Sequence, residues 1–187
     1  MDDHGLKRRP LVIIGLGNEL LSDDGVGIRV VRELRKRPVR GDAVIEELSV
    51  GGFPLLEYIT GFERCIIIDA VVTGRHPPGT AYRFVQGGDP VPFSMTSSHQ
   101  IDLAQILSLA ALMGWDLPRT LTVYGIEAAD ITTFCDACTE EVSRAIPLVV
   151  GAVCSELETD GNSVQKHPGE WQILAEAIEA RFSTEHV

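Results

Sequence analysis

The stretch Leu11-Val-Ile-Ile-Gly-Leu-Gly-Asn-Glu-Leu-Leu-Ser-Asp-Asp-Gly-Val-Gly27 decides the fold of this chain. It opens with a continuous aliphatic run, which is typical of a strand buried on both faces of a parallel sheet. Amphipathic helical spacing follows as far as Pro38, which ends the predicted helix. We therefore expect a strand, a sharp glycine turn and a helix that Ser22 or Asp23 caps.

Strand-like and helix-like segments alternate along the rest of the chain. Further strands are predicted over residues 43–50, 64–69, 80–85 and 120–126, and further helices over 54–61, 97–114 and from 139 onward. The strand over 80–85 is expected to be less buried and to lie at an edge of the sheet. This order predicts an α/β fold, a three-layer α/β/α sandwich with a mostly parallel five-stranded twisted sheet.

The length and composition indicate one domain. The chain has 187 residues, of which 44% are hydrophobic, so it can bury one core and is short for two domains. We expect residues 1–187 to form a single domain with its core over about residues 10–158. A polar linker over 159–168 and an amphipathic helix over 170–182 are expected to follow that core.

The charge of the chain limits the partners that it can bind. Its net charge is −11, so nucleic acid phosphates and anionic membrane surfaces would repel it. No apolar stretch approaches the roughly 20 residues that span a bilayer, and residues 1–10 lack the apolar centre of a signal peptide. We expect a soluble, cytoplasmic protein with neither nucleic acid nor membrane as a partner.

The cysteines do not indicate a disulfide framework. There are four of them, which is too few and too scattered for such a framework in a chain of this length. Cys135-x-x-Cys138 is a single pair, whereas a structural zinc site needs four ligands. We interpret the pair as incidental and expect reduced thiols.

The glycines after the first strand do not match a nucleotide-binding motif. Gly15-x-Gly17 starts like a dinucleotide-binding loop, but Leu20 occupies the position of the third glycine. The Gly-Lys-Ser/Thr sequence of a phosphate-binding loop is also absent. The glycines instead allow a sharp turn that presents a polar segment at the end of the strand.

Three residues that are distant in sequence are expected to meet at one edge of the sheet. Asp24 follows the first strand, Asp69 ends the run Cys65-Ile-Ile-Ile, and His99 lies in the first turn of a predicted helix. In α/β folds, the carboxyl ends of the strands form the edge that binds ligands. Two carboxylates and one imidazole suit a divalent transition metal and leave coordination positions open for a substrate.

Each of these residues also has a purely structural interpretation. Asp24 is in a position to cap a helix, and Asp69 to bind a neighbouring loop by a hydrogen bond. His99 taken alone is more typical of a surface or packing histidine. Burial of Asp69 favours the metal interpretation, because ionised groups in a core are usually paired or coordinating.

Four separate motifs resemble those of the hydrogenase maturation endopeptidases. They are Gly15–Gly27, Ile68-Asp-Ala70, Ser98-His-Gln100 and Glu141-Val-x-x-Ala-Ile-Pro-x-Val149. The resemblance covers about residues 10–155. It implies an α/β sandwich that acts as a cytoplasmic, monomeric peptidase.

The resemblance also implies a substrate and a site. The family removes the C-terminal extension from the precursor of a nickel-iron hydrogenase large subunit after nickel insertion. Its metal-binding and catalytic residues correspond here to Asp24, Asp69 and His99. Nickel is expected to arrive in the precursor, so the resting enzyme is expected to be metal-free.

This chain departs from the family pattern at two positions. Many members have glutamate in place of Asp24, whose shorter side chain must be offset by the loop or by Asp23. Where some members have Asp-Gly-Gly after the second strand, this chain reads Glu46-Glu-Leu-Ser49, so Glu47 is a weak substitute for that aspartate.

Two other functions remain open on the sequence. One is a hydrolase with its own tightly held zinc, and the other is a metal-dependent chaperone that binds the precursor without cleaving it. Asp24 and Asp69 are both candidates for the general base that activates water. We expect Asp23→Ala to remove only a helix cap, at about 0.5 to 2 kcal/mol of stability.

Overall fold

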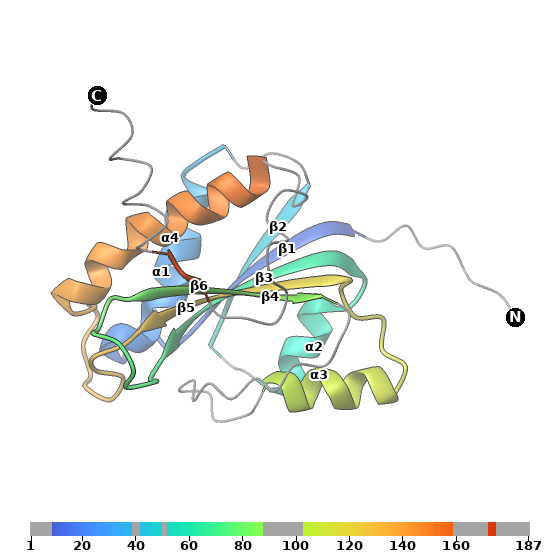
Figure 1. Cartoon of the computed structure of the whole chain (residues 1–187), viewed down its shortest axis with the longest axis horizontal. Helices are drawn as coiled ribbons and strands as arrows, with labels where there is room; N and C mark the ends of the chain where they lie inside the picture. The colour runs from blue at the N-terminus through green and yellow to red at the C-terminus, as the bar shows by residue number, and fades with distance from the viewer. Residues whose placement is uncertain (1–8, 39–41, 50–51, 88–102, 159–171, 175–187) are drawn as a thin grey trace, which may run out of the picture.

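The computed structural model describes residues 9–38, 42–49, 52–87, 103–158 and 172–174. A six-stranded sheet in the order β2-β1-β3-β5-β4-β6 forms the centre of the molecule (Figure 1). The strands are β1 (Arg9–Leu16), β2 (Ala43–Leu48), β3 (Phe62–Val71), β4 (Ala81–Gly87), β5 (Thr120–Glu127) and β6 (Gln172–Ile173). The helices are α1 (Val26–Arg35), α2 (Phe53–Ile59), α3 (Leu103–Leu112) and α4 (Glu140–Glu158), and a 3₁₀ turn, η1 (Ser22–Gly25), precedes α1.

The strand directions place the ends of the central strands at one edge. β1 pairs in parallel with β2 and β3, and β3 pairs in parallel with β5. β4 runs antiparallel to β5, and β6 antiparallel to β4. The carboxyl ends of β1, β3 and β5 therefore meet at the same edge, which we call the rim.

Two apolar clusters fill the space on the two faces of the sheet. Alternate residues of β3 divide between them, because successive side chains of a strand point to opposite faces. Ile66 and Ile68 pack with α1 and α4, whereas Cys65 and Ile67 pack with α2 and α3. Figure 1 shows the corresponding layers, with α1 and α4 on one face and α2 and α3 on the other.

The predicted mostly parallel α/β fold is confirmed, with three corrections. β4 is not a poorly buried edge strand: Tyr82 and Phe84 are 6% and 3% exposed. Its outer side pairs with β6, a sixth strand that the sequence analysis does not predict. The helix expected over 170–182 is wrong at residues 172–173, which form β6, and the neighbouring residues 159–171 and 175–187 lie outside the described residues.

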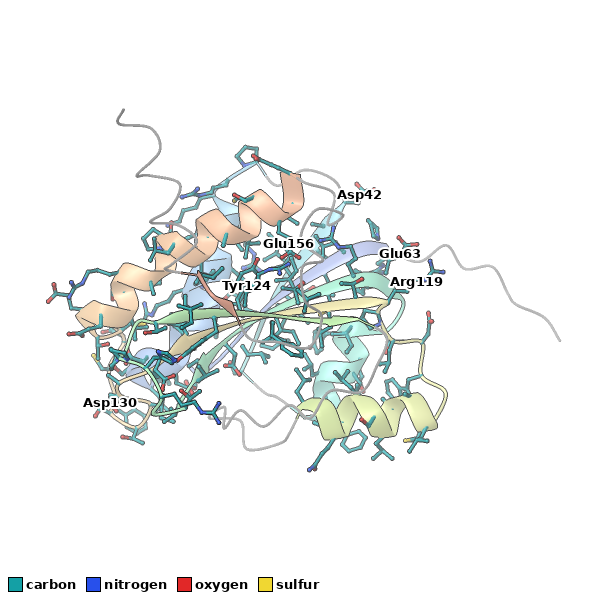
Figure 2. All side chains as sticks on the ribbon, in the orientation of Figure 1. Asp42, Glu63, Arg119, Tyr124, Asp130 and Glu156 are labelled. Atoms are coloured by element: carbon teal, nitrogen blue, oxygen red, sulfur yellow. The ribbon has the colours of Figure 1, made fainter. Side chains whose placement is uncertain are left out.

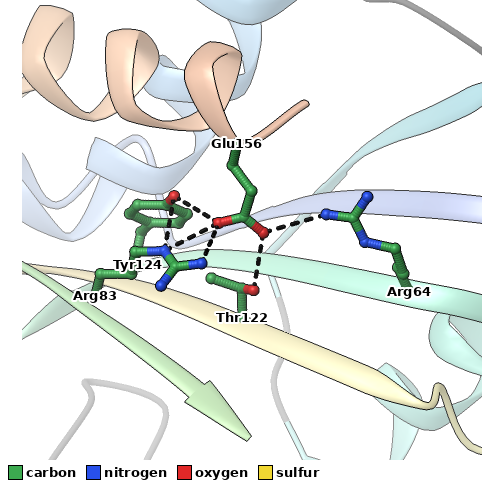
Figure 3. Close-up of polar contacts among 5 residues, drawn as sticks. All are labelled: Arg64, Arg83, Thr122, Tyr124 and Glu156. Atoms are coloured by element: carbon green, nitrogen blue, oxygen red, sulfur yellow. Dashed lines mark hydrogen bonds and ion pairs between the residues drawn. The ribbon is translucent and has the colours of Figure 1, made fainter. Parts of the chain in front are cut away.

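A buried polar network fastens the end of α4 to the sheet (Figure 3). The Glu156 carboxylate accepts hydrogen bonds from Arg83 Nη2 at 2.7 Å, Tyr124 Oη at 2.9 Å and Thr122 Oγ1 at 3.0 Å. Arg64 forms a longer ion pair with it, at 3.3 Å. The network lies away from the rim, since Arg64 is near the amino end of β3.

The described helices include none that is both long enough and apolar enough to cross a bilayer.

Candidate functional site

Glycines bring the turn after β1 into close contact with the rim. Gly17 has φ +142°, and a Cβ added to it would fall 1.9 Å from the carbonyl oxygen of Asp24. A Cβ on Gly27 would fall 2.3 Å from the carbonyl oxygens of Leu16 and Ile68. Only glycine fits such approaches of backbone to backbone. η1 is therefore held against the ends of β1 and β3.

Asp24 is buried within this turn, with 2% of its surface exposed. Its Oδ2 accepts a hydrogen bond from the Asn18 amide at 2.7 Å, and its own amide donates to the Leu21 carbonyl oxygen at 3.0 Å. Its buried Oδ1 accepts no hydrogen bond from the part of the chain that the structure describes. One carboxylate oxygen is thus fixed by the backbone of the turn.

Asp69 lies near the carboxyl end of β3 and is 6% exposed. Its Cα pairs with that of Gly125 in β5, on the face of the sheet that carries Cys65 and Ile67. Burial raises the pKa of Asp69 well above its ordinary value, and the charge of Asp24 raises it further, whereas a backbone hydrogen bond involving Ala70 lowers it. The structure therefore brings Asp24 and Asp69 into electrostatic contact at the rim.

His99 falls within residues 88–102, which lie outside the described residues, as does its expected capping box of Ser97 and Gln100. Among the residues that are described, no three His, Cys, Asp or Glu side chains form a group that could hold a metal ion. The metal-binding and catalytic roles of Asp24, Asp69 and His99 stay predictions.

Asp23 has a different role from the predicted helix cap. It is fully buried, and Asp23 Oδ2 accepts hydrogen bonds from the amides of Ala129 and Asp130 at 2.9 and 3.0 Å. Asp23 Oδ1 accepts from the amide and hydroxyl of Thr139 at 2.7 and 3.0 Å. The N-terminus of α1 has no side-chain cap, because η1 intervenes and turns Asp23 toward residues 128–139.

Residues 128–139 form what we call the clamped loop, which connects β5 to α4. Figure 2 labels Asp130 in this loop, at the end of the molecule opposite Glu63 and Arg119. The loop runs beside the turn after β1, since the Ser22 amide donates to the Cys135 carbonyl oxygen at 2.9 Å. The backbone of Ser22 has φ +46°, an uncommon conformation for a residue with a side chain.

The cysteine pair lies in the clamped loop, beside the carboxylates. Cys135 is exposed, and Cys138 is half-buried with its Sγ 3.6 Å from the Ser22 carbonyl oxygen, to which it donates. Burial raises the pKa of Cys138, while the nearby Arg29 lowers it. This proximity to the site could not be found from the spacing of the two cysteines, since it depends on the path of the loop.

Glu127 is a further buried carboxylate at the rim that the sequence analysis does not single out. It accepts hydrogen bonds from the amide and hydroxyl of Thr73, the Gly74 amide and the Tyr82 hydroxyl, at 2.6 to 2.8 Å. Burial opposes its ionisation, but these hydrogen bonds prevail and lower the pKa of Glu127. Glu127 therefore orders the segment that follows Asp69.

Glu47 binds two arginines of α1. Its carboxylate accepts hydrogen bonds from Arg32 Nε at 3.0 Å and from Arg35, both in α1. Arg32 also forms an ion pair with Glu19 at 2.6 Å. Glu47 thus joins β2 to α1.

Comparisons with known proteins agree with this architecture. The sequence model of a family described as hydrogenase maturation protease (HycI) matches residues 28–156. The chain is 33% identical over 120 residues to the hydrogenase 2 maturation protease of Escherichia coli K12, which covers 62% of this chain and 71% of that protein. It is 28% identical over 162 residues to the hydrogenase expression/formation protein HupD of Rhizobium leguminosarum, covering 84% and 79% respectively.

The solved structure of the hydrogenase maturating endopeptidase HybD from E. coli is similar throughout the core. Its TM-score is 0.68 at 29% sequence identity, over 81% of this chain and 94% of that one. Both the sequence and the fold thus indicate a peptidase of hydrogenase maturation. This chain belongs to the hydrogenase maturation protease family.

Proposed function

We propose that this protein is a nickel-dependent endopeptidase that removes the C-terminal extension of a nickel-iron hydrogenase large-subunit precursor after nickel insertion. The observation that carries the proposal is the buried pair of Asp24 and Asp69 at the rim. Family membership supplies the reaction class, and this pair supplies a place where a divalent cation is recognised.

The electrostatics of the pair favour a cation. Two carboxylates in one buried region repel each other and lose hydration, so the second holds its proton tightly. The raised pKa of Asp69 reports this effect. A divalent cation relieves the same repulsion, and Asp24, Asp69 and His99 together would leave coordination positions for donors from the precursor.

Selectivity follows when the cation belongs to the substrate. A precursor that carries nickel gains the attraction of both carboxylates, whereas an empty precursor lacks this attraction. The difference in binding free energy then separates loaded from empty precursor without a dedicated sensor. The resting enzyme in this proposal holds no metal of its own.

The same residues serve the cleavage step. Docking holds the scissile peptide bond at the rim, which raises its effective concentration near the carboxylates. Asp69 is our candidate for the general base, because its raised pKa makes its carboxylate a stronger base than an exposed one. The nickel of the substrate supplies Lewis acidity for polarising the carbonyl group.

We also propose that the protein acts in the cytoplasm as a monomer, with the precursor as its partner. The resemblance of its motifs to those of the family supports this. The net charge of −11 is unfavourable for a role on nucleic acid or on an anionic membrane.

The test uses nickel-loaded precursor and mass spectrometry of the large subunit. Wild-type protein is expected to shorten the precursor, and Asp24→Asn, Asp69→Asn and His99→Ala to slow this by about 100-fold or more. Glu63→Gln is the matched control, because this exposed carboxylate lies at the opposite end of the sheet. Equal rates in all variants would contradict the proposed site.

Two outcomes separate the alternatives. Stoichiometric zinc in protein purified without added metal would favour a hydrolase with its own metal. Intact precursor in a fully formed complex would favour a chaperone that does not cleave.

A further inference from the structure

Two large apolar side chains stand exposed beside the candidate site. Leu20 is 57% exposed and Phe134 is 82% exposed. They are neighbours through the backbone, because the Cys135 amide donates to the Leu20 carbonyl oxygen at 3.0 Å and Leu21 forms a β-bridge with Cys135. Neither side chain has a role in the site described above.

A short chain of hydrogen bonds connects these side chains to Asp24. The Leu20 amide donates to Asn18 Oδ1 at 3.1 Å, and the Asn18 amide donates to Asp24 Oδ2 at 2.7 Å. Leu20 is therefore one hydrogen-bonded residue away from the carboxylate. The two exposed side chains therefore lie on the segments that adjoin the turn carrying Asp24.

The backbone that carries the pair is held rigidly. Asp23 binds the clamped loop at both of its ends, through Ala129 and Thr139. Arg29 binds its middle, through the Asp136 carbonyl oxygen. Because this backbone is already ordered, binding through its apolar side chains does not have to order the loop, and apolar side chains of this kind provide much of the affinity of protein interfaces.

We propose that Leu20 and Phe134 dock the hydrogenase large-subunit precursor, by contacting an apolar segment next to its cleavage site. This inference rests on the proposed function and adds specificity-determining residues to it. The occupant follows from position: the substrate of a peptidase of this kind is a protein, and the pair adjoins the turn that carries Asp24.

The test compares KM and kcat for cleavage of nickel-loaded precursor. Leu20→Ala and Phe134→Ala are each expected to raise KM about 10-fold while kcat stays within about twofold, because they remove binding and leave the reacting groups in place. Phe134→Leu is expected to restore most of the affinity. The matched control is Leu112→Ala on α3, which removes a side chain that is 86% exposed and is expected to change neither constant.

Several outcomes would overturn the docking role. Unchanged KM in both alanine variants would do so, as would an equal rise in the Leu112→Ala control. Thermal unfolding checks that each variant is folded, and if one of them is not, the other single variant decides. If wild-type protein fails to cleave, the proposed function fails, and surface plasmon resonance with the loaded precursor decides this inference by itself: weaker binding of Phe134→Ala than of Leu112→Ala supports it, and equal binding contradicts it.

Discussion

Asp24 in η1 and Asp69 in β3 interact electrostatically. Burial raises the pKa of Asp69, and the negative charge of Asp24 raises it further. The contact is made by the turn after β1, whose glycines let η1 lie against the ends of the strands. Residues that repel each other in a folded protein reduce its stability, and such strain is typical of functional sites.

Asp69→Asn is expected to make the protein more stable at neutral pH and to abolish processing. The asparagine removes the buried, repelled carboxylate but keeps nearly the same shape. The pKa of Asp69 is higher in the folded state than its ordinary value of 3.8. At a pH between 3.8 and the raised pKa of the folded protein, folding therefore takes up a proton. The stability of the wild type therefore falls as pH rises through this window.

The free energies of unfolding of Asp69→Asn and of the wild type should accordingly become more similar as the pH is lowered toward 3.8. Urea unfolding at a series of pH values measures them. Glu63→Gln, which replaces an exposed carboxylate, is the control and should show no such trend. A less stable Asp69→Asn at neutral pH would contradict the repulsion between Asp24 and Asp69.

Asp23→Ala is expected to lower the free energy of unfolding by about 3 kcal/mol or more, because it leaves buried amide donors without their charged acceptor. Asp23→Asn keeps one acceptor oxygen, so its free energy of unfolding should fall by less than that of Asp23→Ala. The loss exceeds that of a simple helix cap, which is about 0.5 to 2 kcal/mol. Urea unfolding measures both variants, and a loss below about 1 kcal/mol for alanine would show that the clamp is unimportant.

Gly27→Ala is expected to destabilise the protein by about 3 kcal/mol and to displace the turn that holds Asp24. Its Cβ would meet two backbone oxygens at 2.3 Å, and neither can move aside without shifting β1 or β3. Gly151→Ala in α4 is the control, since nothing lies within 4 Å of the added atom. Chemical unfolding of Gly151→Ala should show a free energy of unfolding about 0.5 to 1 kcal/mol higher than that of the wild type.

Glu156→Ala is expected to lower the free energy of unfolding by about 3 to 5 kcal/mol, because buried Arg83 would lose the carboxylate that it pairs with. Glu158→Ala is the control, because Glu158 is exposed on the same helix. Its free energy of unfolding should stay within about 0.5 kcal/mol of the wild-type value. Both should keep the wild-type kcat where they remain folded, since the network lies away from the rim. A reduced kcat in folded Glu156→Ala would link the network to catalysis.

The sequence predicts the central part of the fold well, because β1 and β3 contain continuous aliphatic runs, which are typical of buried parallel strands. The same logic predicts that Asp24 and Asp69 lie at one edge, since both follow such runs. His99 lies outside the described residues, so its place beside them stays a prediction.

The contacts that the sequence does not predict depend on the path of loops. Asp23 binds Ala129 and Thr139, which are more than a hundred positions away, and no local pattern encodes such pairings. The burial of β4 was missed for a similar reason. In the described part of the chain, its edge is covered by Gln172 and Ile173, and so short a strand leaves no periodic signal.

Nickel dependence is best measured by offering nickel-loaded and nickel-free precursor to the wild-type protein and analysing the large subunit by mass spectrometry. We expect the C-terminal extension to be lost only from the nickel-loaded precursor. Removal of the extension at the same rate from the nickel-free precursor would contradict this expectation.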